Sequence, residues 1–190
     1  MPLNEAIFLK IQGLTGVSII DQLMVFLAET LVLLVPLLLI YLWFSGREGR
    51  EDAAFTFGTT VLGIIFAYAM GFLYFHENPS ATYETIAAYH QENSFPSQHT
   101  AALFSAGLPL ILRKKKAFGY LLTLAAVITG FARVYIGEHW PVDIIGAFLA
   151  SSVGLAVAYF SWDPLEPVWR PLLDFYDAMQ EKVLVRISGL

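Results

Sequence analysis

The 190-residue sequence contains no cysteine, and only 14% of its residues are charged. The first absence excludes disulfide bonds, thiolate nucleophiles and cysteine metal sites, so any catalysis must rely on His, Asp, Glu, Ser or Arg. At a net charge of -5 the chain also lacks the broad basic surface that nucleic-acid binding requires. We therefore expect no nucleic-acid partner.

Apolar residues are correspondingly abundant: 57% of the chain is hydrophobic and its mean hydropathy is +0.62, which is typical of a membrane protein. A run that crosses a bilayer needs about 20 residues, or fewer where polar ends reach the interface. The sequence predicts an all-α, integral membrane helical bundle in a single domain, 1–190. About five spans are expected, at residues 22–44, 53–75, 98–112, 117–136 and 141–161.

Both ends of the chain have the pattern of an amphipathic helix. Apolar residues recur at helical spacing near the N-terminus, at Ile7, Phe8, Ile11 and Leu14, and again in the tail from Pro164 onward. Polar residues occupy the positions between them, so we expect an interfacial helix at each end. For the N-terminal stretch, packing as an ordinary core helix is an equal alternative.

The distribution of basic residues predicts the orientation. The RKKK turn at residues 113–116 and the loop with Arg47 and Arg50 are separated by two spans, so they share one side. The positive-inside rule assigns that side to the cytoplasm. The loop 76–97 contains neither lysine nor arginine and therefore lies on the outward side, together with the loop after Arg133.

Four polar residues are expected to converge at the outward surface. From His99 the chain crosses to the RKKK turn and returns over a similar number of residues to Arg133; at about 1.5 Å per residue, both legs reach the same depth. His139 and Asp143 follow in the segment GEHWPVD, where Pro141 predicts a helix start. A carboxylate four residues after a histidine can fix its tautomer and leave one ring nitrogen free as nucleophile or base. The alternative is an aspartate that caps the helix beside an incidental histidine.

The segment SFPSQHT, residues 94–100, predicts a second helix start at the same surface. Ser97 is a candidate N-cap, and the unpaired amides after it form an anion site that His99 faces. By itself this motif favours a capping serine beside a histidine at the membrane edge. Together, however, the two histidines, the arginine, the carboxylate and the helix end are the groups that phosphoryl transfer needs.

These segments resemble the motifs of the type 2 phosphatidic acid phosphatase superfamily, which are integral-membrane lipid phosphatases that share a helical core with vanadium haloperoxidases. Residues 96–99, PSQH, resemble a Pro-Ser-Gly-His motif, and residues 132–143 resemble a Ser-Arg…His…Asp motif. SFPS-x-HT and G-x-H-x-P-V-D are most similar to bacterial undecaprenyl pyrophosphate phosphatases of the bacitracin-resistance type. The likeness extends over residues 74–146 and more loosely over the whole chain.

The resemblance implies a role for each matching residue. His139 would attack phosphorus to form a phosphohistidine, with Asp143 orienting it, and His99 would protonate the leaving group and later activate water. Arg133, Ser97 and the backbone amide of Gln98 would hold the phosphate oxygens. The resemblance implies no metal and no other cofactor, because arginine and helix-end amides supply the positive charge.

Three positions depart from the family motifs. The Asn78-Pro79 pair stands where the family has Arg-Pro, Gln98 replaces the motif glycine, and Ala132 replaces the motif serine. Asn78 is predicted to bind phosphate by a neutral hydrogen bond, which is weaker than a charged pair with arginine.

Two further polar residues lie near these motifs. His76 is interpreted as a polar residue at the membrane edge, and the alternative is a protonated substitute for the missing arginine. Glu138 is interpreted as an exposed loop acid, and the alternative is a contact with substrate or water.

The implied function is hydrolysis of a polyprenyl diphosphate, with undecaprenyl diphosphate as the first candidate, at the outer face of a bacterial cytoplasmic membrane. One alternative is another lipid phosphate, such as phosphatidylglycerol phosphate, phosphatidic acid or a lipid A phosphate, or transfer of the phosphoryl group to a lipid acceptor. The other is a non-catalytic lipid-binding protein. Each has a membrane lipid as its partner, and the sequence predicts no oligomeric state.

Overall fold

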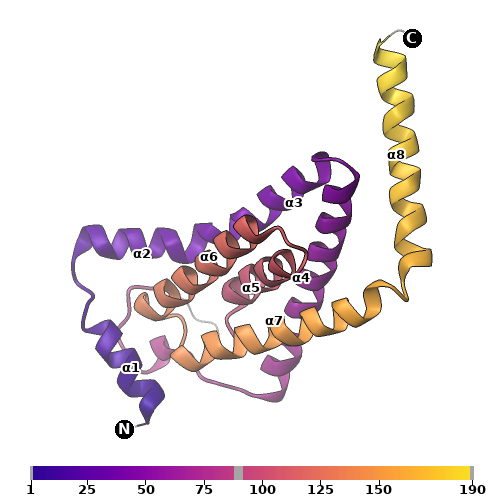
Figure 1. The fold of residues 1–190 in the computed structure, drawn as a ribbon. Coiled ribbons are helices and arrows are strands. Elements are labelled where there is room, and N and C mark those ends of the chain that lie inside the picture. The colour runs from indigo at the N-terminus through magenta and orange to yellow at the C-terminus, as the bar shows by residue number, and fades with distance from the viewer. Residues whose placement is uncertain (1, 88–91, 189–190) are drawn as a thin grey trace.

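The computed structural model describes residues 2–87 and 92–188, and its regular structure is helical (Figure 1). In chain order the helices are α1 (Leu3–Gln12), α2 (Ser18–Thr30), the 3-10 turn η1 (Leu31–Leu33), α3 (Leu34–Phe44), α4 (Arg47–Leu73), the 3-10 turn η2 (Pro79–Ala81), α5 (Gln98–Leu112), α6 (Lys116–Tyr135), α7 (Pro141–Trp162) and α8 (Glu166–Ser188). Within the described ranges there is no strand, only an isolated bridge between Glu77 and Asn93. The prediction of an all-α bundle is confirmed.

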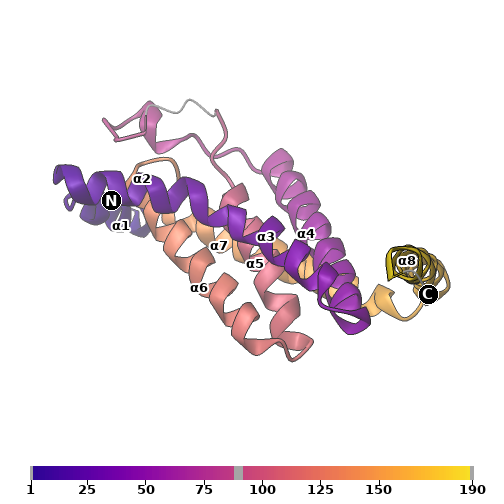
Figure 2. The same cartoon turned by 90° about the horizontal axis from the view of Figure 1, so that it is seen from above.

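Four helical segments are long and apolar enough to cross a membrane: Ser18–Phe44, Arg47–Leu73, Lys116–Tyr135 and Pro141–Trp162. They match four of the predicted spans, and α2, η1 and α3 together form the first of them. The remaining predicted span is α5, which has only 15 residues. It packs against α4, α6 and α7 in the middle of the bundle, and most of its residues are buried (Figures 1 and 2). Because protein surrounds it, α5 does not need the length that lipid exposure demands.

Small residues bring the central helices close together. A Cβ atom added to Gly154 of α7 would lie 2.6 Å from the backbone nitrogen of Gly63 in α4, so these helices touch backbone to backbone. Beside this contact, Ser105 Oγ of α5 donates to Ser151 Oγ of α7 at 2.9 Å. Close backbone approach and interhelical hydrogen bonds hold helices together where lipid removes the hydrophobic driving force.

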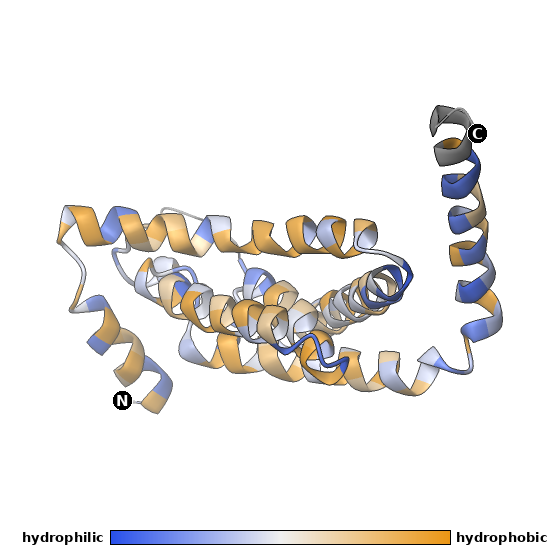
Figure 3. Cartoon of the chain, turned by 45° about the horizontal axis from the view of Figure 1, so that its top comes forward, coloured by the Kyte–Doolittle hydropathy of each residue, from blue (hydrophilic) through white to orange (hydrophobic). Residues whose placement is uncertain are grey.

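The outer surface of the bundle is apolar. Hydrophobic residues prevail along the helices of the bundle, whereas α8 alternates between hydrophobic and hydrophilic residues (Figure 3). Many large side chains are exposed, among them Phe72 at 92% and Phe160 at 75%. An apolar surface of this extent is unsuited to water and suited to lipid tails. The chain is therefore a multi-pass membrane protein.

Helix α1 packs closely on the end of the bundle at which α7 begins. The side chain of Phe8 is fully buried between the rings of Tyr83 and Trp140, at centroid distances of 5.4 and 4.8 Å. Gln12 Nε2 donates to the carbonyl oxygen of Val134 at the C-terminal end of α6, at 2.9 Å. Of the two expectations for this stretch, the structure favours core packing on the buried face of α1.

Helix α8 stands crosswise to α7 at the other end of the bundle (Figure 1). Arg47 Nη1 pairs with Asp174 at 2.7 Å and Asp177 at 2.6 Å, and Arg50 Nη2 pairs with Asp177 at 2.7 Å. The amphipathic pattern of the tail predicts that α8 lies along the membrane plane, and this stays a prediction.

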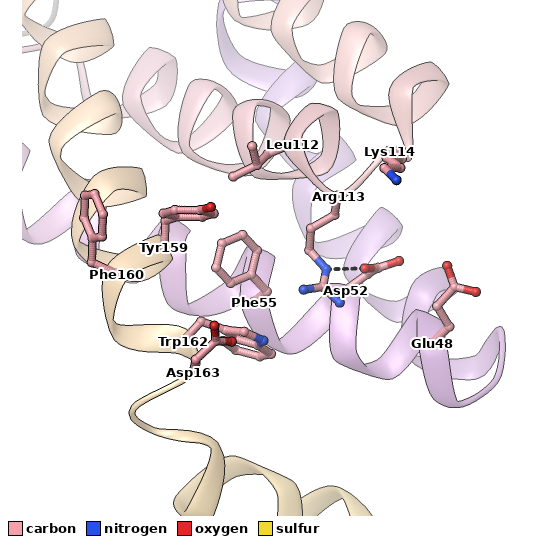
Figure 4. A pocket seen from close by; sticks show the side chains of 10 residues that line it. All are labelled: Glu48, Asp52, Phe55, Leu112, Arg113, Lys114, Tyr159, Phe160, Trp162 and Asp163. Carbon is pink, nitrogen blue, oxygen red and sulfur yellow. Dashed lines mark hydrogen bonds and ion pairs between the residues drawn. The ribbon is translucent and has the colours of Figure 1, made fainter.

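The same end of the bundle contains a polar pocket of about 540 Å³ (Figure 4). Asp52, only 2% exposed, pairs with Arg113. The Arg113 guanidinium also lies over the rings of Phe55 and Trp162, with its carbon 5.4 and 5.6 Å from their centroids. Carboxylate and ring faces together stabilise the cation, and the cluster ties α4, the turn after α5 and α7 together.

We expect Asp52→Ala to lower the free energy of unfolding by about 1–3 kcal/mol, because it removes the hydrogen-bonded carboxylate of Arg113 and leaves only the longer contact with Glu51, at 4.0 Å. The measurement is the thermal unfolding midpoint of the purified protein in detergent. The control is Glu48→Ala, which removes an exposed partner of Lys115 and should leave the midpoint unchanged. Equal effects of the two substitutions would contradict a structural role for the Asp52 pair.

Candidate active site

A cavity of about 350 Å³ lies at the end of the bundle opposite to Arg113. Residues from four helices and from the loop between α6 and α7 line it: Glu29, Tyr68, Gln98, His99, Arg133, Glu138 and His139. The structure thus brings His99, Arg133 and His139 together, as the similar lengths of the chain down to the RKKK turn and back to Arg133 predict. It also places a glutamate from the first span among them.

His139 is held in one tautomer by the chain opposite it. The residue is 3% exposed, and its Nδ1 lies 2.8 Å from the carbonyl oxygen of Ser94. Since a carbonyl can only accept, Nδ1 carries the hydrogen and Nε2 of the neutral ring has a free lone pair. Burial lowers the pKa of His139, which favours this neutral form. The ring is therefore prepared to act as a nucleophile through Nε2.

Asp143 is fully buried beside His139, but its shortest hydrogen bonds go elsewhere. Its Oδ1 lies 2.8 Å from His76 Nδ1, and its Oδ2 accepts from the backbone N–H of Trp140 at 2.8 Å. The distance from Oδ2 to His139 Nδ1 is 3.4 Å, which is long for a hydrogen bond. Asp143 is thus a nearby negative charge for His139, and the close acceptor of Nδ1 is Ser94. Neither sequence interpretation of His76 anticipated its contact with Asp143.

Arg133 lies between two carboxylates. Its Nη1 is 3.1 Å from Glu29 Oε1, and its Nη2 pairs with Glu138. The interpretation of Glu138 as an exposed loop acid is wrong, because the residue is only 6% exposed. Burial raises the pKa of Glu138, while the neighbouring charge of Arg133 opposes the shift. A phosphate that binds the outer N–H groups of Arg133 competes with these acids, and Glu29, whose side chain is 48% exposed, is the one with room to move.

The start of α5 forms the opposite wall of the cavity. Ser97 precedes the first helical residue, as predicted, but its Oγ donates to Thr100 Oγ1 at 3.0 Å instead of capping a backbone amide. Gln98 lines the cavity, and its buried Oε1 has no hydrogen-bond partner among residues 2–87 and 92–188. His99 faces the same acid as Arg133, with Nε2 3.8 Å from Glu29 Oε2.

Asn78 is placed differently from the sequence prediction. It is 4% exposed and does not line the cavity. Its Nδ2 donates to the carbonyl oxygen of Glu138 at 2.9 Å, and its Oδ1 accepts from the backbone N–H of Ser80 at 2.9 Å. With both ends of the amide engaged, Asn78 supports the loop that precedes His139, and this arrangement does not support a direct phosphate contact.

Sequence reasoning missed two residues of the cavity, Glu29 and Tyr68. Tyr68 gave no distinguishing signal within its apolar helix. Glu29 did give a signal, because it is an acidic residue inside an apolar span. A charged side chain there is costly in a membrane and is typical of a functional position.

Comparison with known proteins identifies the family. The sequence profile of the PAP2 superfamily matches residues 53–165. The chain belongs to the PAP2 superfamily. The matched region contains His99, Arg133 and His139, whereas Glu29 and all of α2 lie outside it.

Two curated relatives are bacterial. Over 190 residues the chain is 30% identical to undecaprenyl-diphosphatase BcrC of Bacillus subtilis (strain 168), covering 98% of this chain and 96% of that protein. Over 147 residues it is 30% identical to the putative undecaprenyl-diphosphatase YbjG of Escherichia coli (strain K12), covering 76% of this chain and 74% of that one. Among solved structures, LpxE of Aquifex aeolicus superposes with a TM-score of 0.71 at 22% identity, covering 84% of this chain and 96% of LpxE, which establishes a shared fold.

Gly137 offers a test of the loop that carries His139. Its φ is +85°, and an added Cβ would lie 2.2 Å from Thr85 Cγ2. We expect Gly137→Ala to lower the unfolding free energy by more than about 1 kcal/mol, through backbone strain and this clash. The measurement is thermal unfolding in detergent. Gly58→Ala is the control because its Cβ meets nothing within 4 Å; if Gly137→Ala were equally harmless, the loop would not be constrained as described.

Proposed function

We propose that the protein hydrolyses a polyprenyl diphosphate, with undecaprenyl diphosphate as the first candidate, to the monophosphate and inorganic phosphate. The observation that carries the proposal is the buried neutral His139, whose free Nε2 shares a cavity with Arg133 and His99. A nucleophile, a cation for phosphate and a second histidine for proton transfer are what hydrolysis through a covalent intermediate needs. The names of the two bacterial relatives support the choice of lipid.

In the first step, His139 Nε2 attacks the terminal phosphorus of the diphosphate. The new N–P bond forms as the P–O bond to the bridging oxygen breaks, and that oxygen leaves on the lipid monophosphate. His99 donates a proton to the leaving oxygen. The positive charge that develops on the His139 ring is stabilised by Asp143, 3.4 Å from Nδ1, and by the Nδ1 hydrogen bond to Ser94.

In the second step, water attacks the phosphorus of the phosphohistidine and the N–P bond breaks. His99, now neutral, takes a proton from the water, which restores both histidines and releases inorganic phosphate. Arg133, the backbone amide of Gln98 and the helix start at Ser97 hold the nonbridging oxygens in both steps. The proposal contains no metal and no other cofactor.

The cavity is proposed to open on the outward side of a bacterial cytoplasmic membrane. The basic turn at Arg113 and the Arg47 loop lie at the other end of the bundle, which the positive-inside rule places in the cytoplasm. A lipid diphosphate would keep its tail in the bilayer while its headgroup enters the cavity. Other lipid phosphates, or transfer to a lipid acceptor, would use the same histidines.

Non-catalytic lipid binding is the second candidate function, and one observation favours it. Both terminal nitrogens of Arg133 are already paired with carboxylates, and Asn78 is not positioned to replace the arginine of the family motif. This arrangement weakens phosphate binding unless Glu29 moves.

A panel of purified lipids separates the two candidates. We expect the wild-type protein in detergent to release phosphate from undecaprenyl diphosphate faster than from phosphatidic acid or phosphatidylglycerol phosphate, with and without a chelator. His139→Ala should lower the rate at least about 10³-fold, because the nucleophile is lost. Release of no phosphate from any lipid, or an unaffected His139→Ala variant, would favour non-catalytic binding.

Glu29→Gln tests whether Glu29 competes with the substrate for Arg133. The amide keeps the size of the side chain but replaces a charge-assisted bond by a neutral one, about 1 kcal/mol weaker, so KM for the lipid should fall about fivefold. The measurement is steady-state kinetics, with the exposed loop residue Glu84→Gln as the control. A rise in KM would mean instead that Glu29 contributes to substrate binding.

A further inference from the structure

His76 is fixed in place by the chain that lies opposite it. Its backbone N–H donates to Asn93 Oδ1 at 3.0 Å, and its carbonyl oxygen accepts from the backbone N–H of Ser94 at 2.8 Å and from Ser94 Oγ at 3.0 Å. The imidazole stacks on the indole of Trp140, with centroids 5.5 Å apart and planes inclined by 30°. Both the backbone and the ring of His76 therefore have one defined position.

The ring presents a donor to a buried carboxylate. His76 Nδ1 lies 2.8 Å from Asp143 Oδ1, while the other oxygen of Asp143 accepts from the Trp140 backbone. A carboxylate with no exposed surface needs such donors, because burial without them is costly. The two bonds fix the carboxylate plane and leave Oδ2 3.4 Å from His139 Nδ1.

Two routes connect His76 to the nucleophile. One runs through its side chain and Asp143 to His139. The other runs through its carbonyl oxygen, which holds Ser94, whose own carbonyl oxygen accepts from His139 Nδ1 at 2.8 Å. His76 does not line the cavity, so it has no direct access to a bound phosphate.

We propose that His76 is a positioning residue for the reaction: through Asp143 it sets the orientation of His139. The inference rests on the proposed function, in which His139 is the nucleophile. It also assigns a role to the segment between α4 and η2, which lacks the family's Arg-Pro pair. The family motif leads us to expect a side chain of this segment at the phosphate. In this chain the segment instead supports the nucleophile.

The effect of removing the donor should appear in kcat. Without His76 Nδ1, Asp143 Oδ1 is left buried and unpaired, and the carboxylate turns away from its position beside His139. Misplacement of a reacting group by about 1 Å can cost about 100-fold in rate, so we expect kcat to fall about 10- to 100-fold. KM should change less than about threefold, because His76 does not touch the cavity.

A matched pair of variants tests the donor itself. His76→Phe keeps an aromatic ring on Trp140 but has no donor, whereas His76→Asn places an amide N–H close to the position of Nδ1. We expect kcat of His76→Phe to fall as described. For His76→Asn we expect the fall in log kcat, relative to the wild type, to be at most about half of that in His76→Phe. Glu77→Gln, an exposed neighbour, is the control and should match the wild type.

A second readout needs no turnover. In protein labelled with ¹⁵N-histidine, assigned with His139→Gln, the wild-type His139 should give the signals of a single tautomer protonated at Nδ1. His76→Phe should shift or broaden them, and His76→Asn should restore them. Unchanged His139 signals and unchanged kcat in His76→Phe would overturn the inference, as would equal losses in both variants.

The wild type and His139→Ala, assayed in parallel, separate this inference from the proposed function. If the wild type releases no phosphate from any lipid, the proposed function fails, and the ¹⁵N signals still decide whether His76 orients His139. If the wild type is active, His139→Ala is inactive and His76→Phe is fully active with unaltered signals, only the positioning role fails.

Discussion

The hydrogen bond from His139 Nδ1 to the Ser94 carbonyl oxygen is the interaction on which the site depends. Its length of 2.8 Å and its burial decide which ring nitrogen is free, and so decide whether the histidine can act as a nucleophile. Contacts at the end of the bundle opposite to Arg113 hold the chain around that bond: His76 binds Ser94 and Asn78 holds the backbone of Glu138. The described residues between α4 and α5 thus support His139 as well as connecting two helices.

Charge pairing in a medium of low dielectric constant explains the rest of the polar structure. The partly exposed Arg113 at one end and the buried Arg133 at the other are each paired with acids, and for Arg133 an unpaired buried charge would be costly. At Arg113 the pair joins three parts of the fold. At Arg133 the proposed function adds a second demand, since the acids that stabilise the cation would compete with a phosphate for its N–H groups. Glu29, half exposed and carried by the first span, is the partner that can yield.

The architecture and much of the candidate site could be predicted from the sequence. Apolar runs identified the four segments that are long enough to cross a membrane, because a bilayer dictates their length and composition, and they also identified the shorter α5. The similar numbers of residues from His99 to the basic turn and from that turn back to Arg133 predicted that these two residues lie close together. Contacts made by loops were not predictable: the burial of Glu138 and the contact of His76 with Asp143 depend on how residues 76–87 and 92–97 pack on the end of the bundle, and hydrophobic periodicity does not predict such packing.

The formation of a phosphohistidine at residue 139 is the central claim, and trapping it is the most direct test. Purified protein would be mixed with a lipid diphosphate that carries ³²P in its terminal phosphate, quenched within milliseconds and digested. The account predicts a label that is stable to alkali and lost in acid, located on the peptide with His139 and absent from His139→Ala. Rapid release of labelled phosphate without any labelled peptide at the earliest times would contradict it.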